Sequence, residues 1–136
     1  MMVQVSVSAD VSVTGGPTLP LELVLDPDAY VVSEALLAPQ GRAGAEVTVG
    51  LVPPDVVLTF LAVSAAGPTG SPAVVRVVPA HADETGPVLN VLGSLLMANA
   101  DVVAGLVPGG PLGLILANLE ATTVTVRVLA AFEEIG

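Results

Sequence analysis

The chain has 136 residues and carries 13 acidic side chains against three arginines, for a formal net charge of −10 at neutral pH. Binding to nucleic acid or to an anionic membrane surface requires cations, so this balance argues against both kinds of partner. Cysteine is absent, which excludes disulfide bonds and thiolate metal sites.

Residue usage predicts an all-β fold. Hydrophobic residues make up 53% of the chain and aromatic residues only 2%, so the apolar content is mostly Val, Leu and Ala. Val favours strands, because its branched side chain fits a pleated sheet and loses rotamer freedom in a helix. The 14 Gly and 12 Pro residues interrupt helices and mark turns. The length fits one domain over 1–136.

Two long stretches without charge, 56–75 and 102–119, raise the question of membrane insertion. Several Gly and Pro residues interrupt each of them, so neither offers the roughly 20 helix-compatible residues that cross a bilayer. The N-terminus also lacks the basic region and apolar core of a secretory signal. We therefore expect a soluble protein without a membrane partner.

The first predicted strand, 3–14, alternates strictly between polar and apolar residues. Its apolar positions are Val3, Val5, Val7, Ala9, Val11 and Val13. This period of two indicates a half-buried strand, and we expect its apolar face to lie on the core of the fold. Leucines alternate again over 19–25, and a less regular segment at 29–38 follows the turn "DPDAY".

Three strands are predicted in the middle of the chain. The stretch 45–51 places Ala45, Val47, Val49 and Leu51 on one face. The stretch 56–65, "VVLTFLAVSA", is apolar on both faces, and 73–78 follows after a turn rich in Gly and Pro. The polar loop "PAHADETGP" ends this part of the chain.

The region 88–107 is ambiguous. Its Val content and Gly93 favour strand, and a short helix over 88–98 stays open because short apolar runs cannot be assigned by period alone. Two strands at 112–119 and 123–132 end the pattern. In the last one the inward face consists of Val124, Val126, Val128, Ala130 and Phe132.

These eight to ten strands have the spacing of a sandwich or barrel. We expect a single-domain β-sandwich that is jelly-roll-like. Greek-key and immunoglobulin-like sandwiches are the alternatives, because strand order cannot be derived from one sequence.

Some predicted strands, namely 56–65, 88–97 and 112–119, are apolar on both faces. A sandwich covers only the inner face of each strand, and monomers rarely expose large apolar patches. We expect another copy of the chain or a partner protein to cover the outer faces, with a loop of the same chain as the alternative. The residues predicted at this interface are Val57, Leu61, Val63, Leu114 and Leu116, with Arg76 and Arg127 pairing with carboxylates of the same or a neighbouring subunit.

Two groups of polar residues invite a chemical interpretation. Asp26 and Asp28 offer oxygen ligands for Ca²⁺, but two carboxylates are too few and an Asp-Pro-Asp turn is favoured. His81, the only histidine, lies near Asp83 and Glu84 in the sequence. Without a second His or a Cys, we interpret this segment as a solvated loop.

No catalytic, metal-binding or cofactor-binding residue is predicted. Glu133 and Glu134 are adjacent on a strand and point to opposite faces, so they cannot act together as the acid pair of a glycoside hydrolase. Sugar binding generally uses exposed Trp and Tyr, and the chain has no Trp and only Tyr30.

In overall character the chain resembles the small β-sandwich virion proteins of tailed bacteriophages, such as capsid decoration or cement proteins and some tail or baseplate components. The resemblance covers most of the chain, through its short strands and the closing "LGLILANLEATTVTVRVLAAF", and it is one of type, without a shared motif. It implies a non-enzymatic structural protein of the virion that forms trimers or other oligomers and binds a major capsid or other shell protein.

Two other functions are considered. One is a self-assembling or adhesive bacterial β domain, such as a surface-layer or secretion-apparatus module, at the cell surface or in the cytoplasm. The other is a cupin-like or lectin-like ligand binder. One His and one Tyr are few residues for the polar and aromatic contacts that such a binding site needs.

Overall fold

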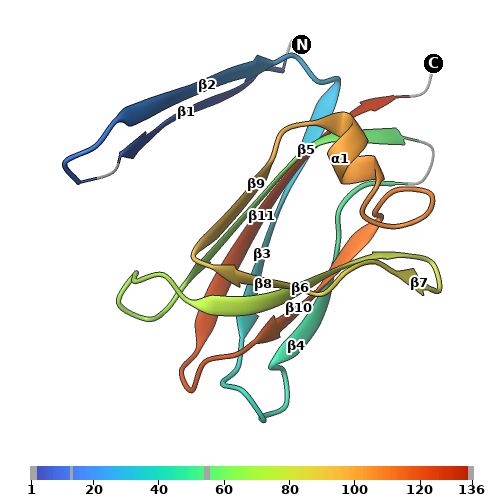
Figure 1. The fold of residues 1–136 in the computed structure, drawn as a ribbon. Coiled ribbons are helices and arrows are strands. Elements are labelled where there is room, and N and C mark those ends of the chain that lie inside the picture. Colours follow the sequence, from blue (N-terminus) through green and yellow to red (C-terminus); the bar gives the residue numbers. More distant parts are fainter. Residues whose placement is uncertain (1–2, 13, 54–55, 135–136) are drawn as a thin grey trace.

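The protein is described by a computed structural model that covers residues 3–12, 14–53 and 56–134. Strands dominate these ranges (Figure 1). The elements are β1 (Val5–Ser12), β2 (Thr18–Leu25), β3 (Ala29–Leu37), β4 (Glu46–Gly50), β5 (Val56–Ala66), β6 (Val74–His81), β7 (Glu84–Thr85), β8 (Leu89–Leu92), β9 (Ser94–Met97), α1 (Ala100–Ala104), β10 (Gly113–Asn118) and β11 (Val124–Glu134).

Two antiparallel sheets pack against each other to form a sandwich, which we call the body (Figure 1). One sheet has the strand order β3-β11-β5-β9. The other has the order β4-β10-β6, and both β7 and β8 pair with β6. The chain crosses between the sheets at every step from β3 to β6, and again from β8 to β9, from β9 to β10 and from β10 to β11. Without the two-residue strand β7, each sheet has four strands, and eight strands connected in this way form a jelly roll. The predicted jelly-roll-like sandwich is therefore confirmed.

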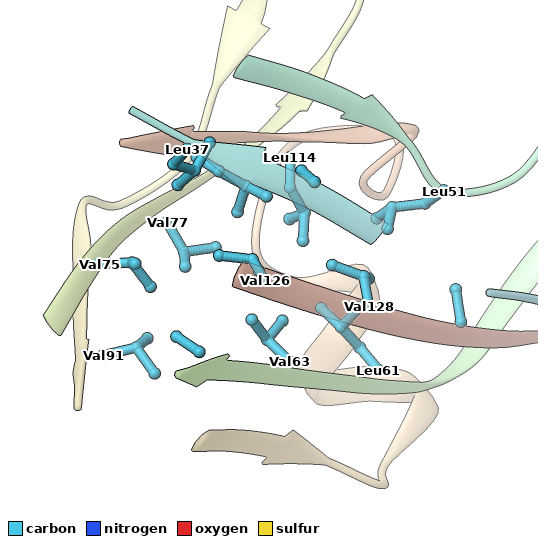
Figure 2. Packing of buried hydrophobic residues seen from close by; sticks show 14 of the residues in the cluster. Leu37, Leu51, Leu61, Val63, Val75, Val77, Val91, Leu114, Val126 and Val128 are labelled. Atoms are coloured by element: carbon cyan, nitrogen blue, oxygen red, sulfur yellow. The ribbon is translucent and has the colours of Figure 1, made fainter. Parts of the chain in front are cut away.

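Aliphatic side chains from both sheets fill the space between them (Figure 2). The predicted inward faces of 45–51 and 123–132 are confirmed at most of their positions. From 45–51, Leu51 lies in the core and Val47 and Val49 pack against it. From 123–132, the core contains Val124, Val126, Val128 and Ala130. Their partners from the other strands include Leu37, Leu61, Val63, Val75, Val77, Val91 and Leu114. Burial of apolar area contributes about 25 cal/mol per Å², which makes this core the main stabilising feature of the body.

Gly93 lets one extended segment serve both sheets. Before it, β8 pairs with β6, and after it, β9 pairs with β5. Gly93 has a φ of +76°, a conformation that glycine adopts without strain. Its N–H donates to the carbonyl of Ala73 (3.0 Å) and its carbonyl accepts from the N–H of Ala65 (2.7 Å). The strand interpretation of 88–98 is therefore confirmed for 89–97, and the helix alternative is wrong there.

The short helix α1 lies further along the chain, beside β5 (Figure 1). The side chain of Asn99 caps it by accepting the N–H of Asp101 at 2.9 Å. Val103 is fully buried and belongs to the core cluster, so α1 contributes one side chain to the body. Across the part of the chain that the structure describes, no helix is long and apolar enough to cross a membrane.

The first two strands form a hairpin of their own, which we call the arm. It projects away from the body (Figure 1), and its strands pair in register from Val5 with Leu25 to Ser12 with Thr18. The expectation that 3–14 packs its apolar face on the core is wrong, because among the described strands β1 pairs only with β2. Alternation of polar and apolar residues identifies the apolar face of a strand, but it does not identify the element that packs on this face. Val13 lies outside the described residues.

Asn118 is a buried polar residue at the end of β10. Its Nδ2 donates to the carbonyls of Ala38 (2.9 Å) and Thr122 (2.7 Å), and its Oδ1 accepts the N–H of Glu120 (2.7 Å). One side chain therefore joins the loop after β3 to the β10–β11 turn and satisfies three backbone groups.

We predict that Asn118→Ala lowers the free energy of unfolding by at least about 1–3 kcal/mol, because it leaves buried backbone groups without partners. Asn90→Ala, at an exposed position on β8, is the matched control. Urea unfolding followed by circular dichroism measures both, and equal midpoints for the two variants would contradict the proposed role of Asn118.

A second pair of variants tests the core. Leu116 is fully buried on β10, whereas Leu92 on β8 is 68% exposed. Leu116→Ala should cost about 2–5 kcal/mol, because it removes buried methyl groups and leaves a cavity. Leu92→Ala should change the free energy of unfolding by less than about 0.5 kcal/mol. Thermal unfolding of dilute samples makes the comparison, and a similar small effect at both positions would contradict this description of the core.

Candidate interaction surface

Four of the residues predicted at an interface lie in the core of the chain itself. The exposed fractions are 1% for Leu61, 2% for Val63 and 0% for both Leu114 and Leu116. These side chains pack between the sheets of the body, so they are not available as contact surface for a partner.

A bulge explains why "VVLTFLAVSA" is apolar at both odd and even positions. Phe60 pairs with Ala131 and Leu58 pairs with Phe132, so Thr59 is the extra residue on β5. Leu58 packs into the core before the bulge, and Leu61, Val63 and Ala65 do so after it. A bulge shifts the alternation by one residue, and a strict period of two applied across it therefore overstates the apolar content of the outer face.

The other three predicted residues are partly or largely exposed. Val57 is 40% exposed and lines a cavity of about 370 Å³ with residues of the 109–112 loop. Arg127 Nε lies 2.9 Å from Glu34 Oε2, and Arg76 lies 3.5 Å from Glu46. Both arginines thus pair within the chain. Exposed pairs of this kind contribute about 0–1 kcal/mol, and a link between subunits stays a prediction.

The polar residues singled out in the sequence make structural contacts. Asp28 Oδ2 accepts the N–H of Glu134 at 2.8 Å, and the N–H of Asp28 donates to the carbonyl of Phe132 at 3.1 Å. Asp28 therefore fastens the start of β3 to the end of β11. Asp26 Oδ1 lies 3.5 Å from the amide nitrogen of Gln4. The turn interpretation fits these contacts.

His81 joins the end of β6 to the loop before β10. Its Nδ1 is 2.7 Å from the carbonyl oxygen of Gly110, and its ring lies against Gly109, where a Cβ atom would come within 3.0 Å of the ring. Among the described residues no three His, Asp or Glu side chains are grouped as a metal site would require.

The arm presents an apolar surface that the body leaves uncovered. Residues directly opposite in an antiparallel pair share a face, and the register places eight apolar side chains on one face of the arm. This arm face consists of Val5, Val7, Ala9, Val11, Leu19, Leu21, Leu23 and Leu25. Toward its tip the exposed fractions are 52% for Val11, 57% for Leu19 and 43% for Leu21.

The sequence contained the signal for this hairpin. Two runs with a period of two flank "GGP" at 15–17, and such a pair of runs around a Gly-rich turn is typical of a β-hairpin. Reading each run separately as a strand of the sandwich missed their pairing.

A second apolar surface lies on the outer face of the sheet β3-β11-β5-β9. There a shallow groove of about 450 Å³ runs across all four strands. We call it the outer groove. Its outward side chains are those of Val32, Ala62, Ser64, Ser94, Leu96, Arg127 and Leu129. Val32 and Leu96 are exposed, and neighbouring positions on β3 add Tyr30 and Leu36.

Three comparisons with known proteins were made. No family model, no curated protein and no solved structure matches the chain. Functional inference therefore depends on the arm face, the outer groove and the fold that presents them.

Proposed function

We propose that the protein is a non-enzymatic structural protein that associates with further copies of itself. The observation that carries this proposal is the arm, which has eight apolar side chains on one face, exposed toward its tip and half-buried toward the body. A two-stranded hairpin alone is at best marginally stable in water and needs a third strand or a packing partner. An exposed apolar ribbon is therefore best explained by a partner surface.

The acidic composition is compatible with this role. A net charge of −10 keeps separate copies apart at low ionic strength and preserves solubility. On the arm the acids Asp10 and Glu22 face away from the apolar side, because they pair with Pro20 and Ser8 on the opposite face. Association through the arm face then buries no carboxylate.

We further propose that the assembly is part of a phage virion, in the manner of a capsid decoration or cement protein. In this role the oligomer, with a trimer as the expected form, binds a major capsid or other shell protein and reinforces the lattice. The jelly roll is compatible with this proposal, since viral capsid proteins use it, although lectins and cupins use it too and fold alone does not assign function.

Light scattering across a dilution series tests self-association. We expect a mass that is a whole multiple of the 13.5 kDa chain and that persists or increases at high salt, because salt screens the repulsion between acidic copies and leaves apolar contacts intact. A monomer at every concentration and salt level would refute self-association.

Immunogold electron microscopy tests the virion proposal. Phage particles are purified from cells that encode the chain and labelled with an antibody against it. Gold over the head lattice is the expected result. Label on the cell envelope with bare particles would favour the bacterial surface role instead.

A further inference from the structure

We infer that the arm of one copy packs face to face on the outer groove of a second copy. This inference deepens the proposed self-association and rests on it. It assigns one occupant to both apolar surfaces of the chain, since each surface covers the other. Every copy then gives one arm and receives one.

The two surfaces match in length. β1 and β2 have 8 residues each, and β3, at the edge of the grooved sheet, has 9. At about 3.3 Å per residue, the arm is about 27 Å long and β3 about 30 Å. The arm face can therefore lie along the sheet over nearly its whole length, in the manner of two packed sheets.

The area is sufficient for a specific contact. With neighbouring strands about 4.8 Å apart, each arm face measures about 27 by 10 Å, or about 270 Å². When two copies exchange arms reciprocally, their interface contains two arm faces and two grooves, or about 1,100 Å², which exceeds the roughly 1,000 Å² that a specific interface needs. In a ring of three copies each interface contains one arm face and one groove, or about 540 Å².

The connection between the arm and the body favours a second copy over the chain's own groove. Only Asp26, Pro27 and Asp28 join β2 to β3. Pro27 is buried, and two hydrogen bonds hold Asp28 against β11. Folding back onto its own sheet would require the arm to reverse within this fastened segment. Instead the arm extends beyond the body (Figure 1).

The charges of the two surfaces are also compatible. The arm face carries no charged residue. In the outer groove Arg127 is paired with Glu34, so an arm packed there covers a paired charge, which costs less free energy than covering a lone charge.

Cysteine cross-linking tests the inference, because the natural chain has no cysteine. Leu21→Cys places a thiol on the arm face, and Leu96→Cys places one on the groove. Both positions are exposed, so folding is preserved. The two variants are mixed under mild oxidation, with one of them labelled with ¹⁵N, and mass spectrometry identifies the disulfide between unlike chains.

The matched control replaces Leu21→Cys with Ser8→Cys, on the opposite face of the arm. We expect at least about tenfold more cross-linking to Leu96→Cys from Leu21→Cys than from Ser8→Cys, because a bound arm holds the thiols at a high effective concentration. Val11→Cys, also on the arm face, should reproduce the result for Leu21→Cys.

The possible failures are distinguishable. A chain that is oligomeric by light scattering but cross-links no better than the control refutes arm exchange and leaves self-association standing. A monomeric chain refutes both. If the double variant with Leu21→Cys and Leu96→Cys forms its disulfide within one chain, the arm covers its own groove and the inferred second copy is wrong.

Discussion

The structure depends on the packing of aliphatic side chains between two sheets, in a core cluster that contains no aromatic side chain. Val and Leu side chains from both sheets of the body interdigitate in one core. Each Val or Leu side chain buries less apolar area than an aromatic side chain would, so a stable core needs many of them. The jelly roll provides inward-facing positions for them on eight strands. The arm contributes no side chain to this core cluster. The body therefore buries its own core but not the arm.

Polar contacts determine how the arm leaves the body. Asp28 fastens the start of β3 to β11 through its N–H and its carboxylate, and Asn118 and His81 fasten loops elsewhere in the body. Each contact satisfies backbone groups at a point where the chain changes direction, which buried polar groups require. None of these contacts involves a residue of β1 or β2, so they leave the arm face uncovered.

Sequence periodicity predicted the all-β class, most strand positions and the inward faces of 45–51 and 123–132. It failed where one residue changes the geometry. The bulge at Thr59 shifted the alternation, so Leu61 and Val63 were assigned to an interface although they lie in the core. The role of Asn118 could not be predicted, because its partners lie on loops that only the fold brings together. The arm face was visible as a pattern, but a pattern does not say whether its cover comes from the same chain.

Two opposing terms determine whether copies of the chain associate: burial of apolar surface favours association, and repulsion between acidic copies opposes it. The arm face gains free energy on burial, whereas the net charge of −10 opposes the approach of copies. The arm alone is marginal as a two-stranded hairpin, so part of the gain offsets the ordering of the arm and the lost freedom of association. If neighbouring copies are already held close together, their high effective concentration reduces the free energy lost when two copies give up their independent motion. Exchange of arms should therefore strengthen wherever copies are already held close together.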